Sequence, residues 1–328
     1  MMQSGMSLRI LLLGKRGSLV QWLENLHQSS ARLGYPTRTF AINGESWGAR
    51  IRAKWEGSSA ATSPWMLARF ERALHDFHPD VVLVVGVFGV PLEYYRILRD
   101  QPWRPLIAGL VGDRFPPDQE RADRCDRLYF TDSSFFQLAA AAGFATPSHY
   151  LPLAVDPEAF RPGQMRRRAE LLFIASRTEF REAVVRGLDT PAYIIGTDWS
   201  ALAREGFHRV HNRKIGRGVV IRRYQRHQAV LNANNEANTA YGLNQRSFEP
   251  LACGAVVIND DLLDLPRCFE PGREILVYRN RDELNALVAR LRREPDWGAQ
   301  IAAAGRRRVL AEHTYGHRIR AILADLGL

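Results

Sequence analysis

The chain has 328 residues, of which 46% are hydrophobic, and carries a formal net charge of +10. This length fits two domains of roughly 150 residues, and the apolar fraction excludes wholesale disorder. The sequence has no run of about 18 uncharged apolar residues, so we expect no membrane span. The apolar run 10–13 is too short for the core of a signal peptide. Cys125, Cys253 and Cys268 lie in unrelated contexts, which argues against a disulfide framework or a metal cluster. We expect a cytoplasmic protein.

Arginine carries almost all of the positive charge, because lysine occurs only at Lys15, Lys54 and Lys214. Arginine is the better bidentate partner for phosphate, but genome composition alone can produce the same bias. An anionic substrate and peripheral contact with an anionic membrane surface both fit the charge. Because the sequence lacks the mixed basic and aromatic pattern of a nucleic-acid reader, we expect no nucleic-acid partner.

The first half of the chain alternates apolar strands with amphipathic helices. Its predicted strands are 8–13, 38–42, 80–85, 106–111 and 127–131, and its predicted helices are 20–33, 65–77, 92–99 and 135–142. This alternation predicts a parallel sheet with right-handed crossovers. The glycine turn after the first strand matches neither G-x-G-x-x-G nor a P-loop.

Ligands of such sheets bind beyond the carboxyl ends of the strands, where Gly14, Gly86 and Asp113 lie. Gly14 leads into Lys15 and Arg16, which either meet an anionic ligand or form a tight turn with solvated charges. Asp113 is the candidate catalytic residue, because a carboxylate there could accept a proton from an acceptor hydroxyl. The alternatives are a loop or capping aspartate, or a partner of a nearby arginine.

A proline-rich, stiff segment, 151–163, marks the boundary between two domains. We expect an N-terminal, acceptor-side domain over 1–160 and a C-terminal domain over 161–310. A terminal helix over 311–328 would pack back toward the first domain. In the second half the predicted strands are 171–175, 192–195, 229–232, 255–259 and 275–278, and the predicted helices are 179–187, 282–293, 297–313 and 315–326. The region 208–226 is polar and basic, and no element is predicted there.

The stretch 241–260 holds the main candidate binding site. The loop Gly242-Leu243-Asn244 leads into a predicted helix with Arg246 and Glu249 on one face. Arg246 would bind a phosphate, or else pair with Glu249. A carboxylate on a mostly apolar helix is costly to bury unpaired, so Glu249 meets either a ligand hydroxyl or an arginine.

Further candidates follow the first two strands of the second domain. Arg177 and Arg181 could clamp a diphosphate, or could be solvated helix residues. Gly196 ends the next strand, and Thr197 and Asp198, which follow it, could face a base or a ribose. Together these residue types suit a nucleotide-sugar.

The C-terminal half resembles the group 1 glycosyltransferase domain of spore-maturation CgeB-type proteins. The resemblance covers roughly 105–320, and its most specific part is the run Arg246-Ser247-Phe248-Glu249 followed by Ala252-Cys253-Gly254. Other matching motifs are Gly242 to Gln245, Phe269 to Glu274, Asp282 to Leu284, His313 to Arg318, Ser176 to Arg181, Gly196 to Trp199, and Leu151-Pro152 through Asp156-Pro157.

This resemblance implies an α/β fold of GT-B architecture, with two Rossmann-like domains facing across a cleft. It implies a nucleotide-sugar donor held mainly by the second domain, with neither a metal nor another cofactor. Glu249 matches the glutamate that contacts the donor ribose, and the loop before it matches the backbone near the sugar and phosphates. Many relatives carry another glutamate eight positions earlier, where this chain has Tyr241. That departure leaves retention or inversion of the sugar open.

The leading hypothesis is therefore a hexosyltransferase-type enzyme that acts on a glycan, lipid or protein acceptor. Two alternatives stay open. One is a catalytically silent GT-B protein that binds sugar nucleotides or serves in assembly, and the other is a sugar-nucleotide epimerase.

Overall fold

The computed structural model of the chain describes residues 7–17, 21–43 and 61–328. Contacts divide it into two compact units, one of Met1–Leu151 with Tyr315–Leu328 and one of Pro152–Thr314. The sequence analysis sets these boundaries at 160 and 310 instead, and the domain limits stay a prediction. Among the described residues, no helix has the length and apolar character needed to cross a membrane.

The first unit is built on a six-stranded parallel sheet in the order β2-β1-β3-β4-β5-β6. Its strands are β1 (Ile10–Gly14), β2 (Thr37–Ala41), β3 (Val81–Val85), β4 (Leu106–Val111), β5 (Arg127–Phe130) and β6 (Ser148–Tyr150). Its helices are α1 (Trp22–Arg32), α3 (Pro64–Phe77), the 3-10 helix η1 (Val87–Gly89), α4 (Leu92–Arg99), α5 (Gln119–Ala122), α6 (Phe135–Ala141) and α14 (Tyr315–Asp325).

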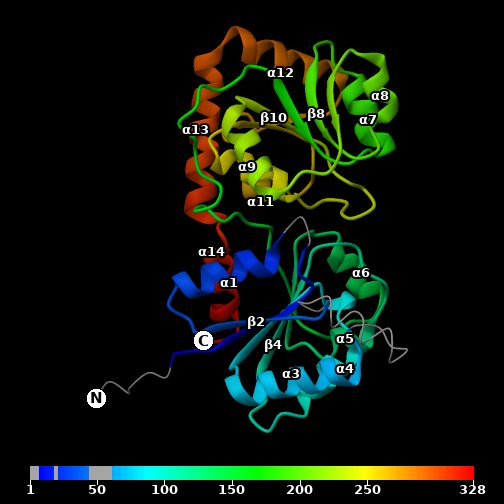
Figure 1. The fold of residues 1–328 in the computed structure, drawn as a ribbon, viewed down its shortest axis with the longest axis vertical. Helices are drawn as coiled ribbons and strands as arrows, with labels where there is room; N and C mark the ends of the chain where they lie inside the picture. Colours follow the sequence, from blue (N-terminus) through cyan, green and yellow to red (C-terminus); the bar gives the residue numbers. More distant parts are fainter. Residues whose placement is uncertain (1–6, 18–20, 44–60) are drawn as a thin grey trace. The chain divides into compact units, whose positions relative to one another are not determined.

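The strands β1, β3 and β4 are buried on both faces of this sheet, which explains why they are continuously apolar. Val82 and Val84 pack into a core with side chains of α3, α4 and α6, and Leu83 on the opposite face is buried as well. The terminal helix α14 lies beside α1 (Figure 1). The hydroxyl of Tyr129 on β5 donates a hydrogen bond of 2.7 Å to Asp325 on α14. The end of the chain is thereby part of the first unit.

The second unit is a six-stranded parallel sheet in the order β12-β11-β10-β7-β8-β9. Its strands are β7 (Leu171–Ile174), β8 (Ala192–Gly196), β9 (Arg209–Asn212), β10 (Ala229–Asn232), β11 (Val256–Asp260) and β12 (Leu276–Tyr278). Its helices are α7 (Glu179–Arg186), α8 (Ser200–Glu205), α9 (Arg217–Arg226), the 3-10 helix η2 (Gln245–Ser247), α10 (Glu249–Ala252), α11 (Leu265–Cys268), α12 (Arg281–Arg293) and α13 (Pro295–Glu312).

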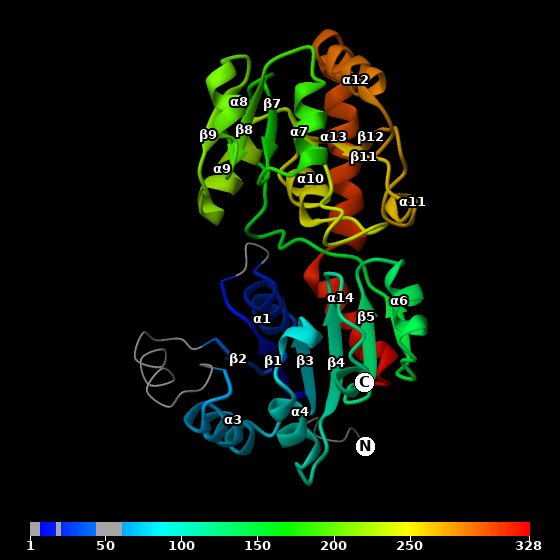
Figure 2. The ribbon, with the colours of Figure 1, turned by 90° about the vertical axis from the view of Figure 1, so that its right-hand side faces the viewer.

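Two cores cover the two faces of this second sheet. Leu172 of β7 packs into a core that includes side chains of α9 and α10, and Phe173 packs into another that includes side chains of α7, α8 and α12. The long helix α13 contributes Val309 to the first core and Ile301 to the second. Figure 2 shows α13 (orange to red) running alongside β11.

The basic region 208–226, where the sequence predicts no element, contains β9 and α9. The strand is at the edge of the sheet and none of its residues is fully buried, so it lacks an apolar signal. The helix buries only Tyr224, and its arginines are half-buried or exposed. The short strand β6 and the short helices α5, α8 and α11 were not predicted either.

Gly196 gives a test of how tightly β7 and β8 are joined at their carboxyl ends. A Cβ atom on Gly196 would lie 1.9 Å from the carbonyl oxygen of Ala175, which is backbone and cannot move aside. We expect Gly196→Ala to destabilise the protein by about 1–3 kcal/mol or more, seen as a lower thermal unfolding midpoint. Gly218→Ala is the control, because its Cβ would meet only the end of Arg222 at 3.6 Å. This helical replacement should leave the midpoint unchanged or raise it.

Candidate functional site

The strand order of the second unit creates a switch point between β7 and β10. The chain winds outward from β7 through β8 to β9, returns to β10 beside β7, and winds the other way to β12. Neighbouring connections therefore leave the carboxyl ends of β7 and β10 in opposite directions. Doubly wound sheets bind their ligands in the crevice at such a point.

Arg181, in the first turns of α7, joins the ends of these two strands. It is 5% exposed, and its guanidinium donates to the carbonyl oxygens of Ala233 after β10 and Ser176 after β7, both at 3.1 Å. Its backbone N–H is bound by Thr178, the N-cap of α7. Burial, and then the positive charge of Arg246, lower the pKa of Arg181 to about 9. This arginine is thus held by neutral partners at a site that disfavours its charge.

Arg246 is a second, partly buried arginine at the same end of the sheet. Its Nε donates to Oδ1 of Asn232 at 3.0 Å, and its backbone N–H donates to Oδ1 of Asn244 at 2.9 Å. Burial lowers its pKa. Within residues 7–17, 21–43 and 61–328, neither Arg246 nor Arg181 has a carboxylate within ion-pair distance. Two like charges in the electrostatic range of each other, without such a partner, favour an anionic ligand.

Asn232, the last residue of β10, fixes the position of Arg246. Besides accepting from Arg246, its Oδ1 accepts from Asn244 at 3.2 Å. Its Nδ2 donates to Oδ1 of Asn259 at 2.7 Å and to Oγ of Ser247 at 3.1 Å. Both donors and both lone pairs of this fully buried amide are therefore used. A satisfied buried network of this kind holds its members in one arrangement.

Asp260 closes the polar cluster at the end of β11. Its carboxylate accepts from the backbone N–H of Asn234 at 3.0 Å and from the Asn259 amide at 3.1 Å. Burial raises its pKa to about 6, although hydrogen bonds from the backbone N–H groups of Asn234 and of Asp260 itself, and the charges of Arg246 and Arg181, act in the opposite direction. Asp260 is therefore the acidic group that lies in the field of both arginines.

Glu249 is the first residue of α10. Burial raises the pKa of its carboxyl group to about 8, with only partial opposition from the charges of Arg217 and Arg246. No hydrogen bond or ion pair to this carboxyl group forms among the described residues. Even a half-buried acid without a partner is costly, so its position suits a ligand that donates hydrogen bonds.

The continuous helix predicted through Arg246 and Glu249 is wrong. Arg246 belongs to the 3-10 helix η2, and Glu249 opens the four-residue helix α10 after a break at Phe248. Pro250 has no N–H to continue a helix and fits the first turn of a new one. The two side chains are still electrostatically coupled. A helix this short offers no extended N-terminal anion site, so the charged side chains carry the argument.

The remaining predicted residues of the second unit have structural partners. Arg177 is exposed and paired with Glu182 on α7. Thr197 donates to Oγ of Ser176 at 3.0 Å, and Gly196 allows the close approach of β7 and β8. In the loop before η2, Leu243 is buried in the core and Gly242 is buried beside it, whereas Asn244 caps η2 and supports Asn232. Asn244 thus lies in the cluster, and Leu243 serves packing.

Two predicted residues belong to the first unit. Gly14 ends β1, where an added Cβ would lie 2.8 Å from the carbonyl oxygen of Val85, so a glycine is needed for packing against β3. Lys15 approaches Gly89, just beyond β3, with its Nζ 3.7 Å from the position of an added Cβ. Asp113 follows β4 and Gly112 and is exposed. Their roles as ligand or catalytic residues stay predictions.

Most residues of the polar network were not predicted from the sequence. Asn232, Ser247, Asn259 and Asp260 are all buried, and none of them was a candidate. The available signal was the position of polar residues at the carboxyl ends of two apolar strands. No group of three or more His, Cys, Asp or Glu residues that could hold a metal ion occurs in the described ranges.

Residues 167–324, just under half of the chain, match the family model described as glycosyl transferase-like. No curated protein sequence matches this chain.

Solved structures resemble it over nearly the whole length. A glycosyltransferase from Rickettsia africae is 11% identical with a TM-score of 0.70, covering 98% of both chains. A sucrose-phosphate synthase from Thermosynechococcus elongatus is 13% identical with a TM-score of 0.69, covering 97% of this chain and 99% of the other. Anabaena HepE in complex with UDP is 10% identical with a TM-score of 0.64, covering 97% of this chain and all (100%) of the other.

At these identities the likeness shows the fold. The predicted fold class, α/β with GT-B architecture, is confirmed by the two parallel sheets and by these structures. The segment with the arginine pair and Glu249 lies within the part that is similar to glycosyltransferases.

The pKa of Glu249 makes a testable prediction about stability. Its value of about 8 in the folded protein exceeds its ordinary value of 4.5, so between these values the folded state holds a proton that the unfolded state has lost. The free energy of unfolding must therefore fall as pH rises across this range. Glu249→Gln removes the ionisable group, and its stability relative to the wild type should rise from about pH 5 to about pH 8.5, by up to a few kcal/mol.

Denaturant unfolding at the two pH values measures this difference. Glu270→Gln is the control, because Glu270 is exposed and paired with Arg273. A difference between Glu249→Gln and wild type that stays constant with pH would contradict the raised pKa.

Proposed function

We propose that this protein is a glycosyltransferase that moves a sugar from a nucleoside diphosphate donor to a hydroxyl group of an acceptor. The observation that carries the proposal is the arginine pair, Arg181 and Arg246, at the switch point of the second unit. Both cations are anchored by neutral groups, which leaves their charge available to a diphosphate. The glycosyl transferase-like match of the same segment supports this function.

Different residues would bind the diphosphate and the ribose hydroxyl groups of the donor. Arg181 and Arg246 would bind the diphosphate and stabilise the negative charge that develops as the sugar leaves. Glu249 would accept hydrogen bonds from the donor ribose. Because Anabaena HepE, a neighbour in structure, was solved with UDP, uridine diphosphate sugars are the first donors to test.

The proposal has finer parts that rest on the sequence. The arginine pair would take the place of a divalent cation, which makes the reaction metal-independent. The transferred sugar would be a hexose, and the acceptor a glycan, lipid or protein. We retain the CgeB-type resemblance and a cytoplasmic location as parts of the same proposal. If the reaction inverts the sugar, Asp113 would take the acceptor proton.

Binding measurements can separate the roles of the arginine and the glutamate. A hydrogen bond to a charged group contributes about 1.5–3 kcal/mol, so we expect Arg246→Gln to weaken UDP binding by roughly 10- to 100-fold while leaving uridine binding unchanged. Glu249→Gln should weaken both UDP and uridine, and should leave pyrophosphate binding unchanged. Isothermal titration calorimetry with the three ligands measures these differences.

Arg186→Gln is the matched control for loss of a positive charge. Arg186 is on the same helix as Arg181, but it is exposed and paired with Glu182 and Glu205. If Arg246→Gln weakened uridine as much as UDP, the phosphate role of Arg246 would be wrong.

Asp113 is tested by turnover. Asp113→Asn keeps the size of the side chain and removes the base. If the reaction inverts the sugar, we therefore expect sugar transfer to fall by about 10²- to 10⁴-fold while UDP binding is unchanged. The assay follows transfer from a UDP-sugar to an acceptor with EDTA present throughout. Transfer at the wild-type rate by Asp113→Asn would remove Asp113 from the mechanism, and activity that requires a metal would remove metal independence.

The two alternative functions give different products in this assay. A silent binding protein would bind UDP saturably and never release it from a UDP-sugar. An epimerase would convert the donor to an isomer without any acceptor. Tyr241, at the position of the usual first glutamate, keeps the silent protein as the main competitor.

A further inference from the structure

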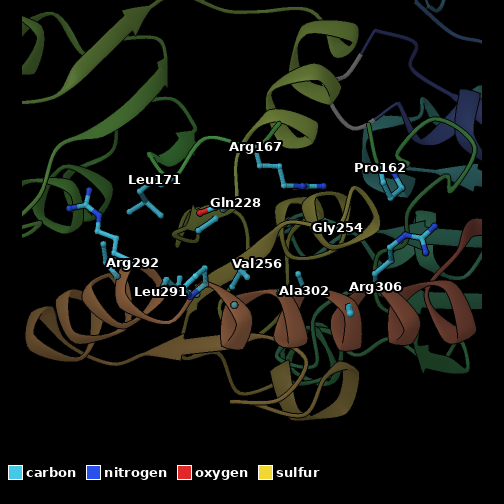
Figure 3. Close-up of a pocket in the computed structure, with 17 residues that line it drawn as sticks. Pro162, Arg167, Leu171, Gln228, Gly254, Val256, Leu291, Arg292, Ala302 and Arg306 are labelled. Carbon is cyan, nitrogen blue, oxygen red and sulfur yellow. The ribbon is translucent and has the colours of Figure 1, made fainter. Parts of the chain in front are cut away.

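A groove of about 390 Å³ opens at the amino-terminal ends of the strands of the second sheet, opposite to the proposed donor site (Figure 3). Its floor includes Leu171, Ala229 and Val256, which are the first residues of β7, β10 and β11. The polar cluster around Asn232 lies at the last residues of the same strands. The groove is therefore separate from the proposed donor site, and its volume falls in the range of about 300–1,000 Å³ typical of small-molecule sites.

Small side chains on α13 create the space in this groove. Gly298, Ala299, Ala302 and Ala303 line one wall. Gly298 packs against Leu291, where an added Cβ would lie 2.9 Å from a side-chain carbon. Apart from three arginines and Gln228, the lining side chains are apolar. A ligand that fills the groove would thus place an apolar body against α13 and the strand starts.

Positive charge gathers at one end of the groove. The guanidinium of Arg167 donates to the carbonyl oxygen of Cys253, and Nε of Arg306 donates to the carbonyl oxygen of Ala252 at 3.3 Å. Both charges act on the buried Cys253 thiol, whose pKa burial nevertheless raises to about 12. Two guanidinium groups therefore converge on consecutive carbonyl groups at the end of α10. Gly254 lies between them in Figure 3.

The lining contains no acidic residue to balance these charges. Among the described residues, neither Arg167 nor Arg306 has an ion pair with a carboxylate. Arg306 uses one of its five N–H groups on Ala252, so its Nη groups are available. Arg292 adds a third, exposed cation at the other end (Figure 3).

Capping of α10 accounts for only part of this arrangement. Basic side chains do bind carbonyl groups at helix ends. Arg167 also donates to the backbone carbonyl oxygens of His227 at 2.8 Å and Tyr224 at 3.3 Å, near the end of α9. Each arginine binds one carbonyl group here, Arg167 that of Cys253 and Arg306 that of Ala252, and neither neutral acceptor cancels a charge. A second cation beside the first raises the electrostatic free energy unless an anion is near. Because the apolar part of the groove begins beside these two arginines, the anion that fits it also carries an apolar chain.

We propose that this groove binds a single-chain amphipathic anion, with its phosphate or carboxylate group at Arg167 and Arg306 and its alkyl chain along α13. The charge complementarity selects an anion, and the apolar lining selects a chain over a free ion. This site is independent of the proposed glycosyl transfer and holds whether or not the protein has that activity.

Titration of the full-length protein with dodecyl phosphate, dodecanoate, inorganic phosphate and dodecyl maltoside, below their micelle concentrations, tests the site. We expect saturable binding of the two anionic amphiphiles and none of the other two. Arg306→Gln and Ala303→Leu should each weaken binding of dodecyl phosphate about 10-fold or more. Arg307→Gln, an exposed arginine outside the lining, should not change it.

Hydrogen exchange gives a second measurement that does not depend on variants. Dodecyl phosphate should slow exchange over residues 298–306 of α13 in the wild-type protein. Equal binding of inorganic phosphate or of dodecyl maltoside would overturn the proposal, as would unchanged affinity in Arg306→Gln and Ala303→Leu. Binding to anionic lipid vesicles that these two substitutions leave unaltered would also overturn it, since a membrane surface would then be the partner.

Discussion

The burial of Arg181 and Arg246 beside each other is the constraint on which the second unit depends. Each guanidinium loses solvation free energy on burial, and in the described part of the chain no ion pair with a carboxylate replaces it. Backbone carbonyls at the ends of β7 and β10 bind Arg181, and the Asn232 amide binds Arg246. These partners are neutral, so they fix the geometry of the cations without cancelling their charge. Asp260 offsets only part of the two positive charges, and the charge that remains in this low-dielectric site attracts an anion.

Burial also affects the two acidic residues of the site. Burial raises the pKa of Glu249 to about 8 and that of Asp260 to about 6. Glu249 is therefore largely protonated near neutral pH and does not compete with a diphosphate for the arginines. The carboxylate of Asp260 accepts hydrogen bonds from the backbone N–H of Asn234 and from the Asn259 amide, which fix its position. The charges thus favour an incoming anion while the hydrogen-bonding groups stay in fixed positions.

The strands were predictable because most are apolar runs buried on both faces. Helix α4 and strands β4 and β10 have the predicted bounds, and β3 differs by one residue. The polar network could not be predicted, because it depends on which strands are neighbours. Asn232 and Asn259 are register partners on β10 and β11, 27 positions apart in the chain. Arg246, Glu249 and Asn244 were found because they are close in sequence, whereas their support comes from residues brought near by the sheet.

The short helix α10 contributes to both proposed sites of the second unit, the polar cluster at the carboxyl ends of the strands and the groove at their amino ends. Its first residue, Glu249, belongs to the polar cluster, and the carbonyl groups at its end, on Ala252 and Cys253, hold the arginines of the groove. Both sites pair arginines with neutral acceptors, so charge alone does not distinguish their ligands. The difference lies in the neighbouring side chains. Asparagine and serine surround the polar cluster at the carboxyl ends of the strands, and alanine, leucine and valine line the groove at their amino ends. Polar surroundings favour a diphosphate with hydroxyl groups, and apolar surroundings favour an anion with an alkyl chain.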